Sequence, residues 1–177
     1  PEKADLFFKQ RLISFQEEWE KKFGWKLFNP LPKEDEHHLK TLRIPLTNEQ
    51  KEFDEQVLSL VKVFIDSLNE KELSKGLTMQ NGAKGIDKFE AFLKAKNVRF
   101  RGMLEFLRDL QELRSTGAAH LKGSKYEKIK ATFSIGQKDL SKVFEDILIK
   151  SATTMNSLEN HFIGRSRGLG EEIGDIS

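Results

Sequence analysis

An arginine and a histidine with five residues between them are the pair in this sequence best suited to chemistry. Arg114 and His120 are separated by Ser115, Thr116 and the small residues 117–119. Imidazole exchanges a proton near neutral pH, and a guanidinium can hold two phosphate oxygens while charge develops on them. These two groups together suit phosphodiester cleavage. No metal is required if the attacking group is the ribose 2′-hydroxyl, so RNA is the substrate to consider.

The spacing of this pair sets a geometric condition. Six residues along a continuous helix correspond to about 600° of rotation and about 9 Å of rise, which leaves the two side chains about 120° apart. They can converge if the helix ends or bends near Gly117, or across a two-fold axis between two copies of the chain. Residues 117–119 would let a second backbone or an RNA strand approach closely. The hydroxyls of Ser115 and Thr116 can donate hydrogen bonds to phosphate, which makes Ser115 a catalytic candidate and Thr116 an RNA-binding candidate.

A basic segment follows the histidine. Its lysines are Lys122, Lys125, Lys128 and Lys130, and Tyr126 lies among them, where it could stack on a base. The formal net charge of the whole chain is only +2, so any nucleic-acid binding has to come from a local patch of this kind. We take Lys122, Lys125, Tyr126 and Lys128 as RNA-binding candidates. The alternative is that these lysines form a solvated helix face.

Other candidate sites are weaker. His37 and His38 follow three acidic residues, 34–36, and could contribute to a metal site, but adjacent histidines do not share one helix face, and we expect a solvated linker there. Gly82 and Gly85 lack the strand and the Lys-Ser/Thr context of a phosphate-binding loop. His161, near the end of a predicted helix, suits the negative end of the helix dipole. With no cysteine in the chain, thiolate metal sites and disulfides are excluded. We therefore expect no metal and no cofactor.

The elements that carry these residues are predicted to be helices. Apolar residues recur at helical spacing in five segments, at about 5–23, 47–69, 86–95, 100–114 and 138–162, and a shorter piece is predicted at 70–75. Thr47 and Gln50 form a capping-box pattern at the start of the second segment. Residues 25–28 are predicted to be an extended arm that packs aromatic side chains on the body, and 33–46 an irregular link. The fold predicted is all-α, a bundle of about five helices with an N-terminal helical and extended arm.

The run 113–124 resembles the HEPN superfamily, small all-α domains with an Arg, four to six residues and then a His late in the bundle. Together with the segment 53–71, it is also similar to uncharacterised bacterial proteins with HEPN-like C-terminal domains. The resemblance implies a metal-independent endoribonuclease, with Arg114 binding phosphate and His120 acting as acid and base. Two positions depart from it: Ser115 stands where the family prefers Asn, His or Asp, and Lys122 where some toxin members carry Tyr. Many members are non-catalytic, so a helical module that dimerises or binds a partner or nucleic acid is the alternative.

The resemblance also implies the organisation of the protein. It covers residues 47–163, with an N-terminal helix and arm at 1–46 outside it and a tail at 164–177 that its glycines predict to be disordered. The family implies a homodimer with a shared site around Arg114 and His120, acting in phage defence or as a toxin with an antitoxin partner. No membrane span or signal peptide is evident, and we expect a cytoplasmic protein. Because the chain starts at Pro1 rather than Met, we expect an upstream domain.

Overall fold

The computed structural model describes residues 3–119 and 123–164. These residues form helices and connecting loops without a β-strand, which confirms the all-α prediction. Eight α-helices are present where about five were predicted: α1 (Ala4–Phe23), α2 (His37–Thr41), α3 (Gln50–Val61), α4 (Glu70–Leu73), α5 (Gly85–Ala95), α6 (Arg101–Ala119), α7 (Ser124–Thr132) and α8 (Leu140–Phe162). The additional helices are the short α2, α4 and α7. The short piece predicted at 70–75 appears as α4.

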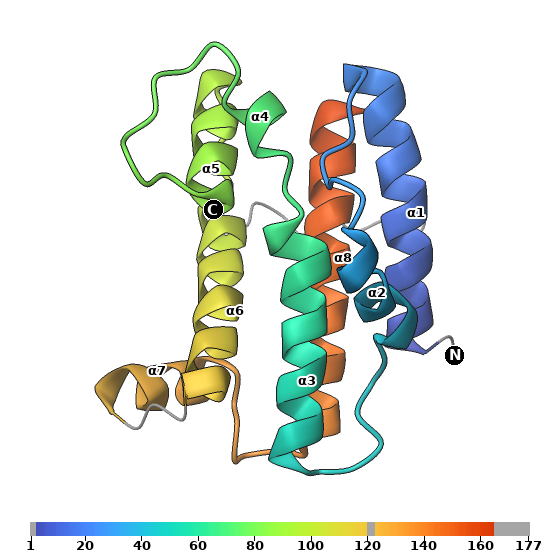
Figure 1. Cartoon of the computed structure of the whole chain (residues 1–177), viewed down its shortest axis with the longest axis vertical. Helices are drawn as coiled ribbons and strands as arrows, with labels where there is room; N and C mark the ends of the chain where they lie inside the picture. The colour runs from blue at the N-terminus through green and yellow to red at the C-terminus, as the bar shows by residue number, and fades with distance from the viewer. Residues whose placement is uncertain (1–2, 120–122, 165–177) are drawn as a thin grey trace.

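The long helices form the body of the molecule. Helices α1 and α8 run side by side, and α3 packs against both α8 and α6 (Figure 1). The helices enclose one continuous hydrophobic core, which the sequence pattern of large apolar residues at helical spacing explains. Helix α1 contributes Phe8, Phe15 and Trp19 to that core, all completely buried. It ends where Gly24 adopts a φ of 80°, a conformation that favours glycine.

The start of α3 differs from the capping-box prediction. The helix begins at Gln50 with Glu49 in the N-cap position, and no side chain caps it. Thr47 instead donates its hydroxyl to Glu52 at 2.7 Å, and the amide of Leu46 donates to the same carboxylate at 2.5 Å. The Glu52 carboxylate therefore organises the turn before the helix. At its other end, α3 continues into a wider π-helical turn, η2 (Lys62–Asp66), which ends at an acidic residue.

The segment after α1 packs against the end of this continuation. Phe28 forms an isolated antiparallel bridge with Leu68, and Gln16 of α1 bonds to both the amide and the carbonyl of Phe28. The region 33–46, predicted to be irregular, contains a 3-10 turn, η1 (Lys33–Asp35), followed by α2. No helix within the described ranges has both the length and the apolar character needed to cross a bilayer.

Candidate functional site

Arg114 lies five residues before the last residue of α6. The core-facing side of this helix is occupied by Leu110 and Leu113, both buried, and Arg114 falls at the edge of that face, where its side chain is 23% exposed. Its Nη1 donates to Oδ2 of Asp66 at 2.6 Å. Because Asp66 ends the π turn after α3, the arginine connects α6 to α3 and is oriented by an acid 48 residues earlier in the sequence.

A surface hollow lies in front of Arg114 between the two helices, and we call it the α3–α6 hollow. Its volume is about 410 Å³, and it is lined by Gln50, Lys51, Asp54, Glu55, Val57, Leu58, Leu113, Arg114 and Gly117. The charged groups of the lining are two cations and two carboxylates, so the lining carries no net charge. An anion would bind here through directed hydrogen bonds from Arg114 rather than through a bulk positive field.

Gly117 allows the two helices to approach closely in this hollow. A Cβ at this position would lie 2.9 Å from Oδ1 of Asp54, which itself accepts a hydrogen bond from Gln50 at 2.8 Å. A close approach is therefore present at Gly117, but the group that approaches is a carboxylate of α3 and not the second backbone or RNA strand that was expected. No spacing in the sequence indicates a role for Asp54 or Asp66, although both fall in the segment 53–71 that carries part of the resemblance.

The two hydroxyl side chains after Arg114 lie in different surroundings. Ser115 is exposed, and its Oγ donates to the carbonyl of Gln111 at 3.2 Å. Thr116 is only 2% exposed and donates to the carbonyl of Leu113 at 2.9 Å. The hydroxyl of Thr116 therefore faces the helix and not the solvent, and a contact of this residue with RNA stays a prediction. Ser115 remains accessible to a ligand.

His120 and Lys122 lie outside the described residues. The structure follows α6 as far as Ala119, one residue before the histidine. The pairing of Arg114 with His120, and the contribution of Lys122 to RNA binding, therefore stay predictions.

The remaining basic residues lie on α7 and divide into two groups. Lys125 is 79% exposed and pairs with Glu112 at 3.2 Å. Because Glu112 is two residues from Arg114, it lies about 200° away around α6, so Lys125 and Arg114 are on opposite sides of that helix. Lys128 is also exposed. Burial, followed by the nearby Glu105, raises the pKa of Asp109 on α6 above its usual value, and Lys128 opposes that rise.

Tyr126 points to the other side of α7. The Nζ of Lys130 lies 5.6 Å from the centroid of its ring, and both residues line a second hollow of about 450 Å³, which we call the α7 hollow. Gln50 lines the α7 hollow as well as the α3–α6 hollow. The two hollows therefore adjoin at the start of α3.

His38 has a different environment from the solvated linker that was predicted. Its side chain is 13% exposed, its Nδ1 lies 2.9 Å from the hydroxyl oxygen of Ser59, and its Nε2 lies 3.8 Å from Oδ1 of Asp35. Burial, the neighbouring His37 and Lys62 lower the pKa of His38, while Asp35 opposes them. These residue types resemble a hydrolytic triad, but Ser59 is only 5% exposed and cannot reach a substrate. Among the described residues, no group of three or more potential metal ligands comes together.

Comparison of the chain with family models, curated proteins and solved structures finds no match. Its function has to be inferred from the geometry of these residues.

Proposed function

We propose that the chain is a HEPN-type endoribonuclease in which Arg114 holds the scissile phosphate and His120 transfers the protons. The observation that carries this proposal is the position of Arg114, partly exposed on the wall of the α3–α6 hollow, with its guanidinium oriented by Asp66. A guanidinium has five N–H donors, and the bond to Asp66 leaves others for phosphate oxygens. Such a nuclease would suit phage defence or a toxin–antitoxin pair.

The proposed reaction needs no group beyond the RNA and these side chains. The ribose 2′-oxygen attacks phosphorus, the bond from phosphorus to the 5′-oxygen breaks, and the products are a 2′,3′-cyclic phosphate and a 5′-hydroxyl. His120 takes the proton from the 2′-hydroxyl and returns a proton to the 5′-oxygen. Arg114 stabilises the negative charge that develops on the non-bridging oxygens.

The adjoining hollows support RNA as the substrate. A strand with its phosphate at Arg114 can continue past Gln50 into the α7 hollow, where Tyr126 offers a ring for stacking and Lys130 a cation for the next phosphate. Leu58 lines the α3–α6 hollow and is 38% exposed, so an apolar contact is available there for a second copy of the chain. This placement supports a dimer in which two Arg114 regions face each other.

One observation favours the non-catalytic alternative. Arg114 is already neutralised by Asp66 within one chain, at 2.6 Å, and a phosphate has to compete with that carboxylate. If Arg114 serves only to hold α6 against α3, the protein is a helical module that dimerises or binds a partner. The two readings differ in whether the guanidinium contacts RNA.

The test is cleavage of a 5′-labelled mixed-sequence RNA by the full chain in excess EDTA. We expect products with cyclic phosphate ends from the wild type, and losses of at least about 100-fold for Arg114→Ala and His120→Ala. Arg101→Ala is the matched control, because Arg101 is an exposed arginine at the first residue of the same helix. Circular dichroism and light scattering must show that all variants have the fold and oligomeric state of the wild type.

The outcomes separate the two readings. Cleavage that survives in Arg114→Ala, or that is lost equally in Arg101→Ala, contradicts the proposed site. If the wild type binds the RNA without cutting it and Arg114→Ala does not alter that binding, Arg114 is structural, and the helical-module reading replaces the nuclease.

A further inference from the structure

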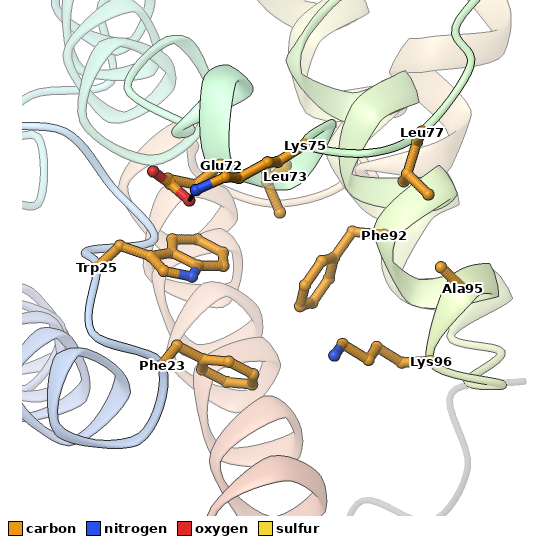
Figure 2. A pocket seen from close by; sticks show the side chains of 9 residues that line it. All are labelled: Phe23, Trp25, Glu72, Leu73, Lys75, Leu77, Phe92, Ala95 and Lys96. Carbon is orange, nitrogen blue, oxygen red and sulfur yellow. Dashed lines mark ion pairs between the residues drawn. The ribbon is translucent and has the colours of Figure 1, made fainter.

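An aromatic hollow of about 410 Å³ opens at the other end of the bundle, between the end of α1 and helices α4 and α5 (Figure 2). Phe23 and Trp25 line it from the α1 side and Phe92 from α5, while Leu73 and Leu77 close it above. Its size and its mostly apolar lining are those of small-molecule sites. None of these residues contributes to the α3–α6 hollow, so a ligand here does not depend on the proposed nuclease function.

The three rings form a continuous apolar floor. The centroids of Trp25 and Phe92 are 5.8 Å apart with the planes at 86°, and those of Phe23 and Phe92 are 6.0 Å apart at 72°. Because the rings already contact one another edge to face, they leave no slot into which a flat group could intercalate. Phe23 and Trp25 remain partly exposed, so a ligand would lie on the floor and cover them.

A cation stands over this floor. The Nζ of Lys96 lies 5.7 Å from the centroid of Phe92, and Figure 2 shows the side chain reaching across the hollow toward Phe23. Within the part of the chain that the structure describes, no carboxylate pairs with Lys96. The other lysine of the lining, Lys75, is 75% exposed and lies 3.9 Å from Glu72. The charges of the lining therefore sum to a positive value, and the unpaired cation is the one that faces the rings.

We propose that this hollow binds a small amphipathic anion, with a ring-bearing apolar body on the floor of Phe23, Trp25 and Phe92 and a carboxylate on Lys96. The apolar body would remove the exposed ring surface from water. The carboxylate would form a charge-assisted hydrogen bond with the Lys96 ammonium, which already lies over the ring of Phe92. A neutral ligand of the same shape gains the free energy of burying the rings but not that of the charge-assisted hydrogen bond.

The experiment is calorimetric titration of the full chain with sodium 2-naphthoate, in parallel with the neutral 2-naphthalenemethanol. We expect one saturable site for the naphthoate, with the alcohol binding about fivefold or more weakly. In NMR spectra, the indole N–H signal of Trp25, identified with Trp25→Phe, should shift on binding. Trp19 is completely buried beneath the same cluster, so its indole signal should shift less than that of Trp25.

Variants of two lysines at the end of α5 test the role of charge. Lys96→Met should weaken naphthoate binding about fivefold or more without affecting the alcohol, and Lys96→Arg should retain it. Lys94→Met is the matched control, because Lys94 pairs with Glu90 at 3.5 Å and does not line the hollow. The proposal is overturned if the wild type shows no saturable naphthoate binding, if the alcohol binds equally well, or if the two methionine variants bind alike.

Discussion

At the scale of single residues, His38 makes stability depend on pH. Its folded-state pKa is lowered from the ordinary 6.5 mainly by burial, with His37 and Lys62 acting in the same direction and Asp35 against them. A lowered pKa means that the unfolded chain binds a proton more readily, so the stabilisation is complete above about pH 6.5 and is lost as the pH falls through the folded-state value. We expect unfolding in urea to require less denaturant at pH 5.5 than at pH 7.5.

The variant His38→Asn should flatten that pH dependence. His161→Asn is the control, because His161 is an exposed histidine on α8, outside the α2–α3 contact. The titration of His38 is not the cause if both variants keep the wild-type slope of unfolding free energy against pH. His37 is unsuitable as a control because its ring lies 4.0 Å from that of His38.

Gly117 and Asp54 should be energetically coupled. Replacing glycine by alanine inside a helix ordinarily stabilises it by about 1 kcal/mol. Here the new Cβ would lie 2.9 Å from Oδ1 of Asp54, so the carboxylate has to move away from Gln50. We expect Gly117→Ala to be nearly neutral in the wild type and stabilising by about 1 kcal/mol in an Asp54→Ala background. Equal effects in both backgrounds, measured by urea unfolding, would show that the contact with Asp54 does not reduce the stabilisation by alanine.

The sequence predicted that Gly117 allows close approach, but not what approaches it. Small residues next to a candidate site indicate available space. Which residue fills that space, here Asp54, depends on how α3 packs against α6. The same holds for Arg114, whose partner Asp66 is 48 residues away. Helical periodicity shows which side of an element faces the core, and it contains no information on which polar residues meet across two elements.

At the scale of the elements, one buried ion pair joins α1 to α8. Arg11 Nη2 lies 2.6 Å from Oε2 of Glu159, and the two side chains are 11% and 1% exposed. Removing one partner leaves a charge in the interior, so Glu159→Ala should lower the free energy of unfolding by about 3 kcal/mol. The double variant Arg11→Met with Glu159→Leu should recover most of that loss, because it removes both charges and keeps the volume.

An exposed pair on the same helix serves as the control. Lys142 lies 3.5 Å from Asp146 and its side chain is 53% exposed, so Lys142→Ala should change stability by about 0.5 kcal/mol or less. Urea unfolding of the wild type and the three variants measures these differences. A loss for Glu159→Ala no larger than that for Lys142→Ala would mean that water reaches the Arg11 pair.

The long elements were predictable for a physical reason that does not apply to the short ones. Helices α1, α3, α6 and α8 each bury a stripe of apolar residues over several turns, which leaves a clear period in the sequence. Helix α2 has five residues and buries none, so no period marks it. It is held by contacts such as the one between His38 and Ser59. The N-cap Asn69, which accepts from the amide of Glu72 at 3.2 Å, is the local signal for α4.

At the scale of the whole molecule, the α3–α6 hollow, which contains Arg114, and the aromatic hollow, which contains Lys96, lie at opposite ends of the bundle. Figure 1 shows α7 at one end of the bundle and α4, α5 and the end of α1 toward the other. The α3–α6 hollow is lined by residues of α3 and of the last turns of α6, and the aromatic hollow by residues of α4, α5 and the end of α1. A second copy of the chain can therefore cover the Arg114 region without covering Lys96. The oligomeric state can thus be tested separately from the proposed anion site.

The dimer predicted from the HEPN resemblance should depend on Leu58. This residue is 38% exposed on the lining of the α3–α6 hollow, so an interface around Arg114 would bury it. An aspartate there would then lose its water without gaining a partner, and Leu58→Asp should weaken the dimer at least about tenfold. Ile13→Asp is the matched control, because Ile13 is 59% exposed on α1, which does not line the hollow.

Size-exclusion chromatography with light scattering, over a range of protein concentrations, measures both variants. A wild-type dimer that Leu58→Asp converts to monomer, and that Ile13→Asp leaves intact, places the interface at the α3–α6 hollow. A wild type that stays monomeric at every concentration contradicts the dimer itself. A dimer that Leu58→Asp leaves unchanged places the contact elsewhere, and any catalysis would then have to be completed by Arg114 and His120 of a single chain.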